Sequence, residues 1–194
     1  MAFSKCRLTQ RNWNVTALIL LLALGQPAQS IAQETLASET ASLQTARKEV
    51  HIDLPGFDLN VTLHLPHPFR SHSPAVIMLP GLMADVDQYD SYGQSLAAKG
   101  MIVAVHPWYS PLTSDVELAH NAKLMRDWLI NAILVDPGHI GIAGHSMGAK
   151  DAILAAGLYP DFAAVVAIDP DDSGDVSAVD SYVPHLTAPL LLIG

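Results

Sequence analysis

The sequence predicts an α/β fold, in which helices cover both faces of a mostly parallel sheet. Short apolar runs alternate along the chain with longer runs of helical periodicity. Several of the apolar runs are followed by turn-forming or reactive residues, and these are Pro80-Gly81, His106, Ser146 and Asp169. Because parallel strands end at one edge of a sheet, we expect these residues to gather there.

The first strands form a predicted hairpin. Apolar and polar residues alternate over 50–54 and again over 59–65, which is typical of half-buried strands. Pro55-Gly56 between them indicates a turn. Residues 75–79 are then apolar without interruption, which predicts a strand buried on both faces that ends at Pro80-Gly81.

The middle of the chain predicts two helices around another buried strand. The first helix covers residues 88–99 and ends at Gly100, and the strand covers 101–105. Asp115 is the predicted N-cap of a longer helix that ends at residues 136–138. Apolar residues with helical spacing support this helix, and they are Leu118, Ala122, Met125, Leu129 and Ile133.

The last third predicts a strand over 139–143, a helix over 150–158, and strands over 163–168 and 189–193. A turn at Tyr159-Pro160 separates the helix from the strand that follows. Alternation of this kind favours parallel pairing through right-handed crossovers.

The segment Gly144-His145-Ser146-Met147-Gly148 carries the strongest functional signal. It lies between the predicted strand and the predicted helix. A serine at so sharp a turn adopts strained backbone angles that expose its hydroxyl, and glycines two residues away on each side leave room for the bend. We therefore predict that Ser146 is a nucleophile and that the Met147 N–H is one donor of an oxyanion hole.

The first residues indicate export. Lys5, Arg7 and Arg11 precede a short apolar run at 15–24, and small residues follow, which predicts a secretory signal peptide over 1–32. The run is shorter than the ~20 residues of a membrane span. We expect a secreted or periplasmic protein with no membrane association after cleavage.

The remaining chain divides into a polar linker over 33–47 and one domain over 48–194. Cys6 lies in the leader, so the mature chain has no disulfide. Without the leader, seven Lys and Arg face nineteen Asp and Glu, for a formal charge of −12. This charge argues against nucleic acid as a partner and favours neutral or cationic substrates. The sequence does not indicate an oligomeric state.

Over roughly residues 50–194 the chain resembles the α/β-hydrolase superfamily, within the group of dienelactone hydrolases, chlorophyllases and polyester-cleaving cutinases. The elbow is similar to that of chlorophyllases, which also have a lysine at the position of Lys150, although Met147 and Ala149 replace the usual Arg and Gly. Two further segments are similar to chlorophyllases and one to polyester hydrolases. They are Ile168-Asp169-Pro170, Tyr182-Val183-Pro184 and, for the polyester hydrolases, Leu79-Pro80-Gly81-Leu82.

The resemblance implies a serine hydrolase that cleaves small or polymeric carboxylic esters through an acyl-enzyme, with no cofactor and no metal. It also implies that the second oxyanion donor is the N–H of Leu82. A chlorophyllase-like activity, a dienelactone-hydrolase-like activity and a non-catalytic, degenerate hydrolase domain remain alternatives.

The resemblance places the triad acid at Asp169, with Asp171, Asp175 and a residue beyond Gly194 as alternatives. In this fold the catalytic histidine follows the acid and an eighth strand. His185 precedes the last predicted strand and would lie on the wrong side of the sheet, and His145 is expected to pack or to form hydrogen bonds. We therefore expect that the last strand and helix, with the catalytic histidine, lie beyond Gly194.

Two groups of residues have spacings that could suggest a metal site. The spacing Asp169-x-Asp171-x-Ser173-Gly174 matches a calcium loop, but the segment follows a strand, contains Pro170 and ends in Asp180 instead of Glu. Calcium remains an alternative that would compete with the role of Asp169 as acid. Three histidines with no acidic partner nearby are predicted to lie on the surface without binding zinc, and they are His64, His67 and His72.

Overall fold

The computed structural model describes residues 44–107, 112–174 and 176–194. The predicted signal peptide, Cys6 and Asp175 lie outside these residues, so the statements about them remain predictions. Within the described part of the chain, no helix is long and apolar enough to cross a membrane.

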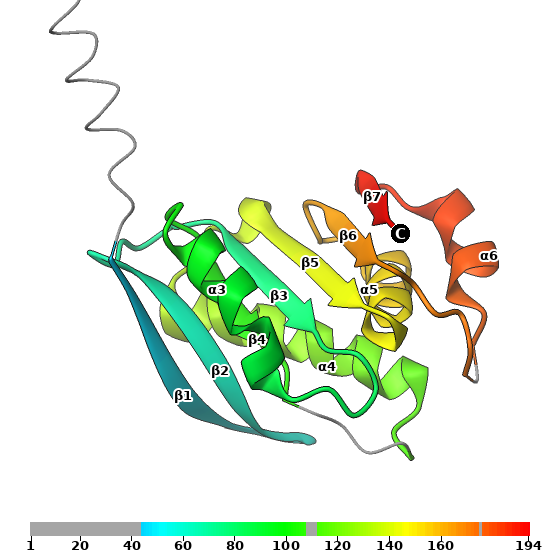
Figure 1. The fold of residues 1–194 in the computed structure, drawn as a ribbon, viewed down its shortest axis with the longest axis horizontal. Coiled ribbons are helices and arrows are strands. Elements are labelled where there is room, and N and C mark those ends of the chain that lie inside the picture. The colour runs from blue at the N-terminus through cyan, green and yellow to red at the C-terminus, as the bar shows by residue number, and fades with distance from the viewer. Residues whose placement is uncertain (1–43, 108–111, 175) are drawn as a thin grey trace, which may run out of the picture. The chain divides into compact units, whose positions relative to one another are not determined.

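The centre of the fold is a seven-stranded sheet in the order β1-β2-β4-β3-β5-β6-β7 (Figure 1). The five strands β4, β3, β5, β6 and β7 run parallel to one another. By contrast, β2 pairs antiparallel with both β1 and β4. This confirms the predicted mostly parallel sheet. The strands are β1 (Gln44–Leu54), β2 (Phe57–His67), β3 (Ala75–Leu79), β4 (Ile102–Val105), β5 (Ile140–His145), β6 (Val165–Ile168) and β7 (Leu190–Ile193).

The predicted hairpin is present as β1 and β2. Val50 lies opposite Val61, and the turn between the strands contains Gly56 at φ +79°, a backbone angle that glycine adopts without strain. The first strand begins at Gln44, earlier than predicted, because residues 44–47 of the expected linker pair with the end of β2.

Helices cover both faces of the sheet, as predicted. Figure 1 shows α3 (Asp90–Ala97) on one face, and α4 (Asp115–Trp128) and α5 (Met147–Leu158) on the other. The shorter helical segments are η1 (Val86–Tyr89), the π-helical turn η2 (Leu129–Ile133) that continues α4, η3 (Pro137–His139), α6 (Ala178–Tyr182) and η4 (Val183–His185). The sequence pattern did not predict α6 or η4, because each is only one or two turns long.

The start of α4 differs from the prediction. Ser114 is the N-cap, and its hydroxyl accepts a hydrogen bond from the Glu117 N–H at 3.2 Å. The prediction that Asp115 caps this helix was wrong, because its carboxylate turns inward toward Lys150 and the residue is buried. The apolar face is confirmed, since four of its predicted residues are buried, and they are Leu118, Ala122, Met125 and Leu129.

Each face of the sheet has its own apolar core. On β3, Ala75, Ile77 and Leu79 pack with the core that contains residues of α4 and α5, whereas Met78 and Val76 pack with Tyr89 in the smaller core beneath α3. Burying one such aliphatic side chain contributes roughly 1.5–3 kcal/mol. The two layers hold the carboxyl ends of β3, β5 and β6 in fixed positions.

The expectation that His64 lies on the surface without an acidic partner was wrong. The residue is 0% exposed, and its Nε2 lies 3.3 Å from an oxygen of Asp90. Its ring packs so closely on Gly93 that a Cβ there would overlap it. Burial lowers the pKa of His64, although Asp90 opposes this shift. His67 and His72 are exposed, as predicted.

Candidate serine nucleophile site

Ser146 lies at the turn between β5 and α5 with φ 53° and ψ −123°. Such angles cost a residue other than glycine about 1–3 kcal/mol, so the surroundings must hold them in place. The Ser146 N–H donates to the carbonyl of Ile168 at 2.9 Å, and its own carbonyl accepts from Ala149 at 3.0 Å and from Asp171 at 3.2 Å. The side chain is half-buried. This is the backbone geometry that the elbow motif predicts.

The glycines of the motif are required by close backbone contacts. A Cβ on Gly144 would overlap the carbonyl of Gly148, and a Cβ on Gly148 would overlap the carbonyls of Leu79 and Pro80. The start of α5 is therefore pressed against both β5 and the end of β3. Only residues without a side chain allow the helix to begin so close to the sheet.

The loop after β3 lies directly against the elbow. An alanine Cβ at Gly81 would lie 3.2 Å from His145 Nδ1 and 3.4 Å from the Ser146 Cβ. The loop then turns tightly, since Met83 has φ 58° and the Ala84 N–H donates to the Gly81 carbonyl at 3.1 Å. The structure therefore places Pro80-Gly81 beside Ser146, as predicted.

Two backbone N–H groups beside Ser146 are available to a substrate. Within the described part of the chain, neither the Leu82 N–H nor the Met147 N–H donates to a protein acceptor. Met147 directly follows Ser146, and Leu82 directly follows the glycine that contacts Ser146. Donors held in place before the reaction are the requirement for stabilising an oxyanion.

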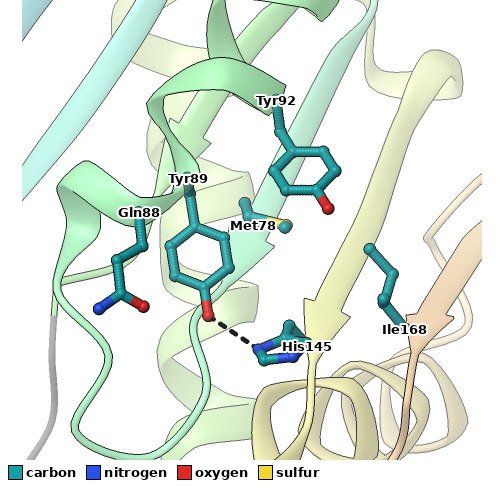
Figure 2. A pocket seen from close by; sticks show the side chains of 6 residues that line it. All are labelled: Met78, Gln88, Tyr89, Tyr92, His145 and Ile168. Carbon is teal, nitrogen blue, oxygen red and sulfur yellow. Dashed lines mark hydrogen bonds between the residues drawn. The ribbon is translucent and has the colours of Figure 1, made fainter.

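Tyr89 is a residue that sequence reasoning missed. It ends η1, is 4% exposed, and its hydroxyl accepts a hydrogen bond from the Gly81 N–H at 2.8 Å. The same hydroxyl lies 3.2 Å from His145 Nδ1 (Figure 2), so His145 forms a hydrogen bond as predicted. Burial raises the pKa of Tyr89, although the Gly81 hydrogen bond opposes the shift. No local sequence pattern indicates a contact between residues 81 and 89.

Asp169 lies at the end of the strand next to Ser146. In the parallel pairing of β5 and β6, Ile168 is opposite His145, so Asp169 and Ser146 are the next residues on neighbouring strands. Asp169 has φ 46°, its N–H donates to the Ile193 carbonyl at 2.5 Å, and its side chain is exposed. Its role as the triad acid remains a prediction.

The carboxylates that follow Asp169 hold their own loop together. Asp171 accepts a hydrogen bond from the Ser173 N–H at 3.0 Å, and hydrogen bonds from Ser173 lower the pKa of Asp171. Asp172 accepts from the first two N–H groups of α6 at 2.8 and 3.2 Å. Burial would raise the pKa of Asp172, but the hydrogen bonds from Ser177 and from the α6 backbone lower it.

A buried ion pair anchors the same loop. Lys150 Nζ lies 2.6 Å from Asp115 Oδ2, with the two side chains 0% and 3% exposed. Lys150 also donates to the Ser173 carbonyl at 2.6 Å, and Asp115 accepts from the Val176 N–H at 2.9 Å. The pair therefore joins α5, the start of α4 and the loop after β6. The sequence signal was the pair of charged residues Lys150 and Asp151 at the start of an otherwise apolar helical run.

This arrangement does not support the calcium alternative. The ammonium group of Lys150 donates a hydrogen bond to the Ser173 carbonyl. The segment with calcium-loop spacing is therefore already in contact with a positive charge. Across residues 44–107, 112–174 and 176–194, no group of three His, Cys, Asp or Glu side chains is placed to hold a metal ion.

His106 follows β4 at the same edge of the sheet. It is 1% exposed, its N–H donates to the Met78 carbonyl at 2.9 Å, and Nδ1 lies 2.7 Å from the Pro107 carbonyl. Burial lowers the pKa of His106 to about 4, although the hydrogen bond to Pro107 opposes the shift. The imidazole is therefore neutral at pH 7.

His185 and Ser146 lie at opposite edges of the sheet. It ends η4 and precedes β7, whose first residue, Leu190, pairs with Val165 at the start of β6. His185 is therefore at the amino edge of the sheet, whereas Ser146 is at the carboxyl edge, as predicted. No hydrogen bond joins the Ser146 hydroxyl to any other residue that the structure describes.

A shallow cleft of about 120 Å³ opens beside His145. Figure 2 shows the rings of Tyr89 and Tyr92 on one side and the Ile168 side chain on the other. The remaining lining side chains are Met78 and Gln88. The cleft therefore combines aromatic and aliphatic surface with polar atoms from the tyrosines, Gln88 and His145.

No family model and no curated protein sequence matches the chain. Among solved structures, 976 chains match, so the architecture is widely used. One is the crystal structure of a candidate dienelactone hydrolase from Klebsiella pneumoniae subsp. pneumoniae MGH 78578, with a TM-score of 0.67 and 18% identity over 77% of this chain and 72% of that chain. The fold is that of the α/β-hydrolases.

This confirms the predicted α/β-hydrolase fold, and at 18% identity the likeness extends to the fold alone. Ser146, Met147, Leu82 and Asp169 all lie where the carboxyl ends of the strands meet, which is where α/β proteins bind their ligands.

Proposed function

We propose that this α/β-hydrolase fold is a serine hydrolase that cleaves carboxylic esters through an acyl-enzyme intermediate. The main support is the strained backbone of Ser146 at φ 53°, beside the two available N–H groups of Leu82 and Met147. A strained serine next to preorganised donors is the arrangement that acyl transfer requires. The structural likeness to a candidate dienelactone hydrolase supports hydrolysis in general.

The proposed reaction has two halves. The Ser146 hydroxyl loses its proton to a general base and attacks the ester carbonyl carbon, and the oxyanion accepts hydrogen bonds from Leu82 and Met147. The intermediate collapses and the alcohol leaves with a proton, which forms the acyl-serine. Water then attacks the acyl carbon and releases the acid. Asp169 orients the base, and one lost oxyanion donor would raise the barrier by about 3 kcal/mol.

The surroundings of the site favour bulky or polymeric esters. Among the described residues between β6 and β7, the helical segments are the short α6 and η4, and Leu82 and Met83 expose 41% and 71% of their surfaces beside the site. An apolar, exposed rim of this kind accommodates a large ester. A measured preference for short, soluble esters alone would contradict this part of the proposal. Export of the enzyme is proposed from its leader sequence.

Dienelactone-hydrolase-like activity is the second candidate, and the structural neighbour favours it. The nucleophile argues against it, because that activity is associated with cysteine and the elbow here carries Ser146. Parallel assays with a dienelactone and with p-nitrophenyl esters would separate the two activities.

The decisive experiment is labelling of the complete gene product with a fluorophosphonate probe. We expect one adduct, located on Ser146 by peptide mass spectrometry, and no labelling of Ser146→Ala. Ser95→Ala, an exposed serine on α3, is the matched control and should label normally. Labelling that persists in Ser146→Ala, or a folded wild-type protein that does not react, would show that the proposed nucleophile is wrong.

A further inference from the structure

The Tyr89 hydroxyl connects two backbone segments that belong to different parts of the site. It accepts the Gly81 N–H at 2.8 Å and bonds to His145 Nδ1 at 3.2 Å (Figure 2). A hydroxyl has only one hydrogen. The oxygen therefore accepts the Gly81 N–H with a lone pair, and toward His145 Nδ1 the hydroxyl donates or accepts according to the tautomer of the imidazole.

Both partners of Tyr89 are one residue away from the proposed chemistry. Gly81 precedes Leu82, which carries one proposed oxyanion donor, and His145 precedes Ser146. The two segments also touch, since an alanine Cβ at Gly81 would be 3.4 Å from the Ser146 Cβ. A small shift of Gly81 would therefore change the distance between the Leu82 and Met147 N–H groups.

The hydroxyl itself is the part of Tyr89 that this contact requires. The ring is 4% exposed and packs in the core beneath α3, where a phenylalanine would fill the same space. Without the oxygen, the Gly81 N–H would lose its acceptor at a buried position, and a buried unpaired donor costs about 1–3 kcal/mol. The loop would relax toward another acceptor and away from the elbow.

We propose that Tyr89 is a positioning residue of the oxyanion hole, which sets the place of the Leu82 N–H relative to Ser146 through its hydrogen bonds to Gly81 and His145. The inference rests on the proposed ester hydrolysis. Tyr89 acts on the barrier and not on substrate binding, because the oxyanion exists only after the attack.

The test is Tyr89→Phe in the complete gene product. We expect kcat to fall about 10- to 100-fold, because a misplacement near 1 Å reduces rates on this scale, while KM changes less than about twofold. Inactivation by the fluorophosphonate should slow by a similar factor, since its adduct also places an oxygen in the hole. At long times Ser146 should still label completely.

The matched control is Tyr159→Phe. Tyr159 bonds to His120 Nδ1 at 3.2 Å with ring centroids 6.3 Å apart, which closely matches the 3.2 Å and 6.2 Å of Tyr89 and His145. This second tyrosine–histidine pair is outside the site, so kcat should stay within about twofold of wild type. A general effect of losing such a pair would appear equally in both variants.

His145→Leu provides a second test if Tyr89→Phe does not fold. It leaves the bond between Gly81 and Tyr89 intact but releases the hydroxyl from the elbow, and we expect a fall in kcat of about 3- to 10-fold at constant KM. Unchanged kcat in either folded variant, or a loss confined to KM, would overturn the role of Tyr89 while Ser146 labelling is preserved. Absence of labelling in the wild-type protein would instead refute the proposed function.

Discussion

The two loops that meet at Ser146 are held there by different interactions. The loop after β3 is fixed by neutral groups, through the bond between Gly81 and the Tyr89 hydroxyl. The loop after β6 is fixed by the buried pair of Lys150 and Asp115. Neutral polar groups lose less hydration free energy on burial than charged groups, which are costly to bury unless both partners are present. We therefore expect substitutions in the buried ion pair that holds the loop after β6 to destabilise the protein more than substitutions around the loop after β3.

The largest expected effect is on catalysis, and it tests whether the loop after β6 supplies the triad acid. In Asp169→Asn we expect kcat to fall about 10⁴-fold, because the base would lose the carboxylate that orients it. Asp171→Asn is the matched control and should remain within about threefold of wild type, since an amide oxygen can still accept the Ser173 N–H. Ester turnover by both purified variants measures this. A larger loss in Asp171→Asn would transfer the acid role to that residue.

The second prediction concerns the ion pair of Lys150 and Asp115, which holds the loop after β6. Lys150→Met should lower the free energy of unfolding by about 3–5 kcal/mol, because it leaves the Asp115 carboxylate buried without its cation. Urea denaturation measures the change. Lys123→Met is the control. Lys123 pairs with Asp127, four residues further along the same helix, and more than a third of each side chain is exposed. Loss of this exposed pair should cost no more than about 0.5 kcal/mol.

If Lys150→Met cost no more than this control, the buried pair would not be the anchor of the loop. Adding Asp115→Leu to Lys150→Met should recover part of the lost stability, because the double variant no longer buries a carboxylate without its cation. The same urea curves measure this recovery.

The third prediction concerns the pH dependence of stability that arises from His106, the buried histidine after β4. Its folded pKa of about 4 lies below the usual 6.5, so between these values the unfolded chain binds a proton that the folded chain does not. The free energy of unfolding should therefore fall as the pH drops from 6.5 to 4, by about 3 kcal/mol in total. His64, whose pKa burial also lowers, adds to the fall.

Urea denaturation at pH 7, 5.5 and 4 measures this dependence. His106→Asn keeps a side-chain donor but removes the titration, so its stability should change less over the same range. Equal slopes in the wild type and in the variant would show that His106 is not the source.

The smallest effect concerns α6. Asp172→Ala should destabilise the protein by about 1 kcal/mol, because two N–H groups at the start of α6 lose their acceptor. Asp180→Asn, an exposed carboxylate in the first turn of the same helix, should change stability by less than about 0.5 kcal/mol. The melting temperatures of the two variants measure this difference. Equal shifts in melting temperature would mean that Asp172 does not cap α6.

Local pattern predicted the parts of the site that lie close together in sequence. The strand, turn and helix around Ser146 are encoded within the residues of the elbow motif, and the Met147 donor follows from the same turn. The positions of Asp169 and Pro80-Gly81 followed from the buried strands that they end, whereas their predicted roles came from the family resemblance. Asp115 was misread as a cap, since the pattern of a polar residue before an apolar face cannot distinguish it from Ser114.

The sequence by itself determined the alternation of the main strands and helices, the hairpin and the sharp turn at Ser146, because hydrophobic periodicity and turn residues act over a few neighbouring positions. Only the tertiary structure decided which side chains from distant segments meet. Tyr89 reaches His145 across 56 residues and Val176 reaches Asp115 across 61. These contacts depend on how α3, α4 and α5 pack on the sheet, and no local pattern carries that information.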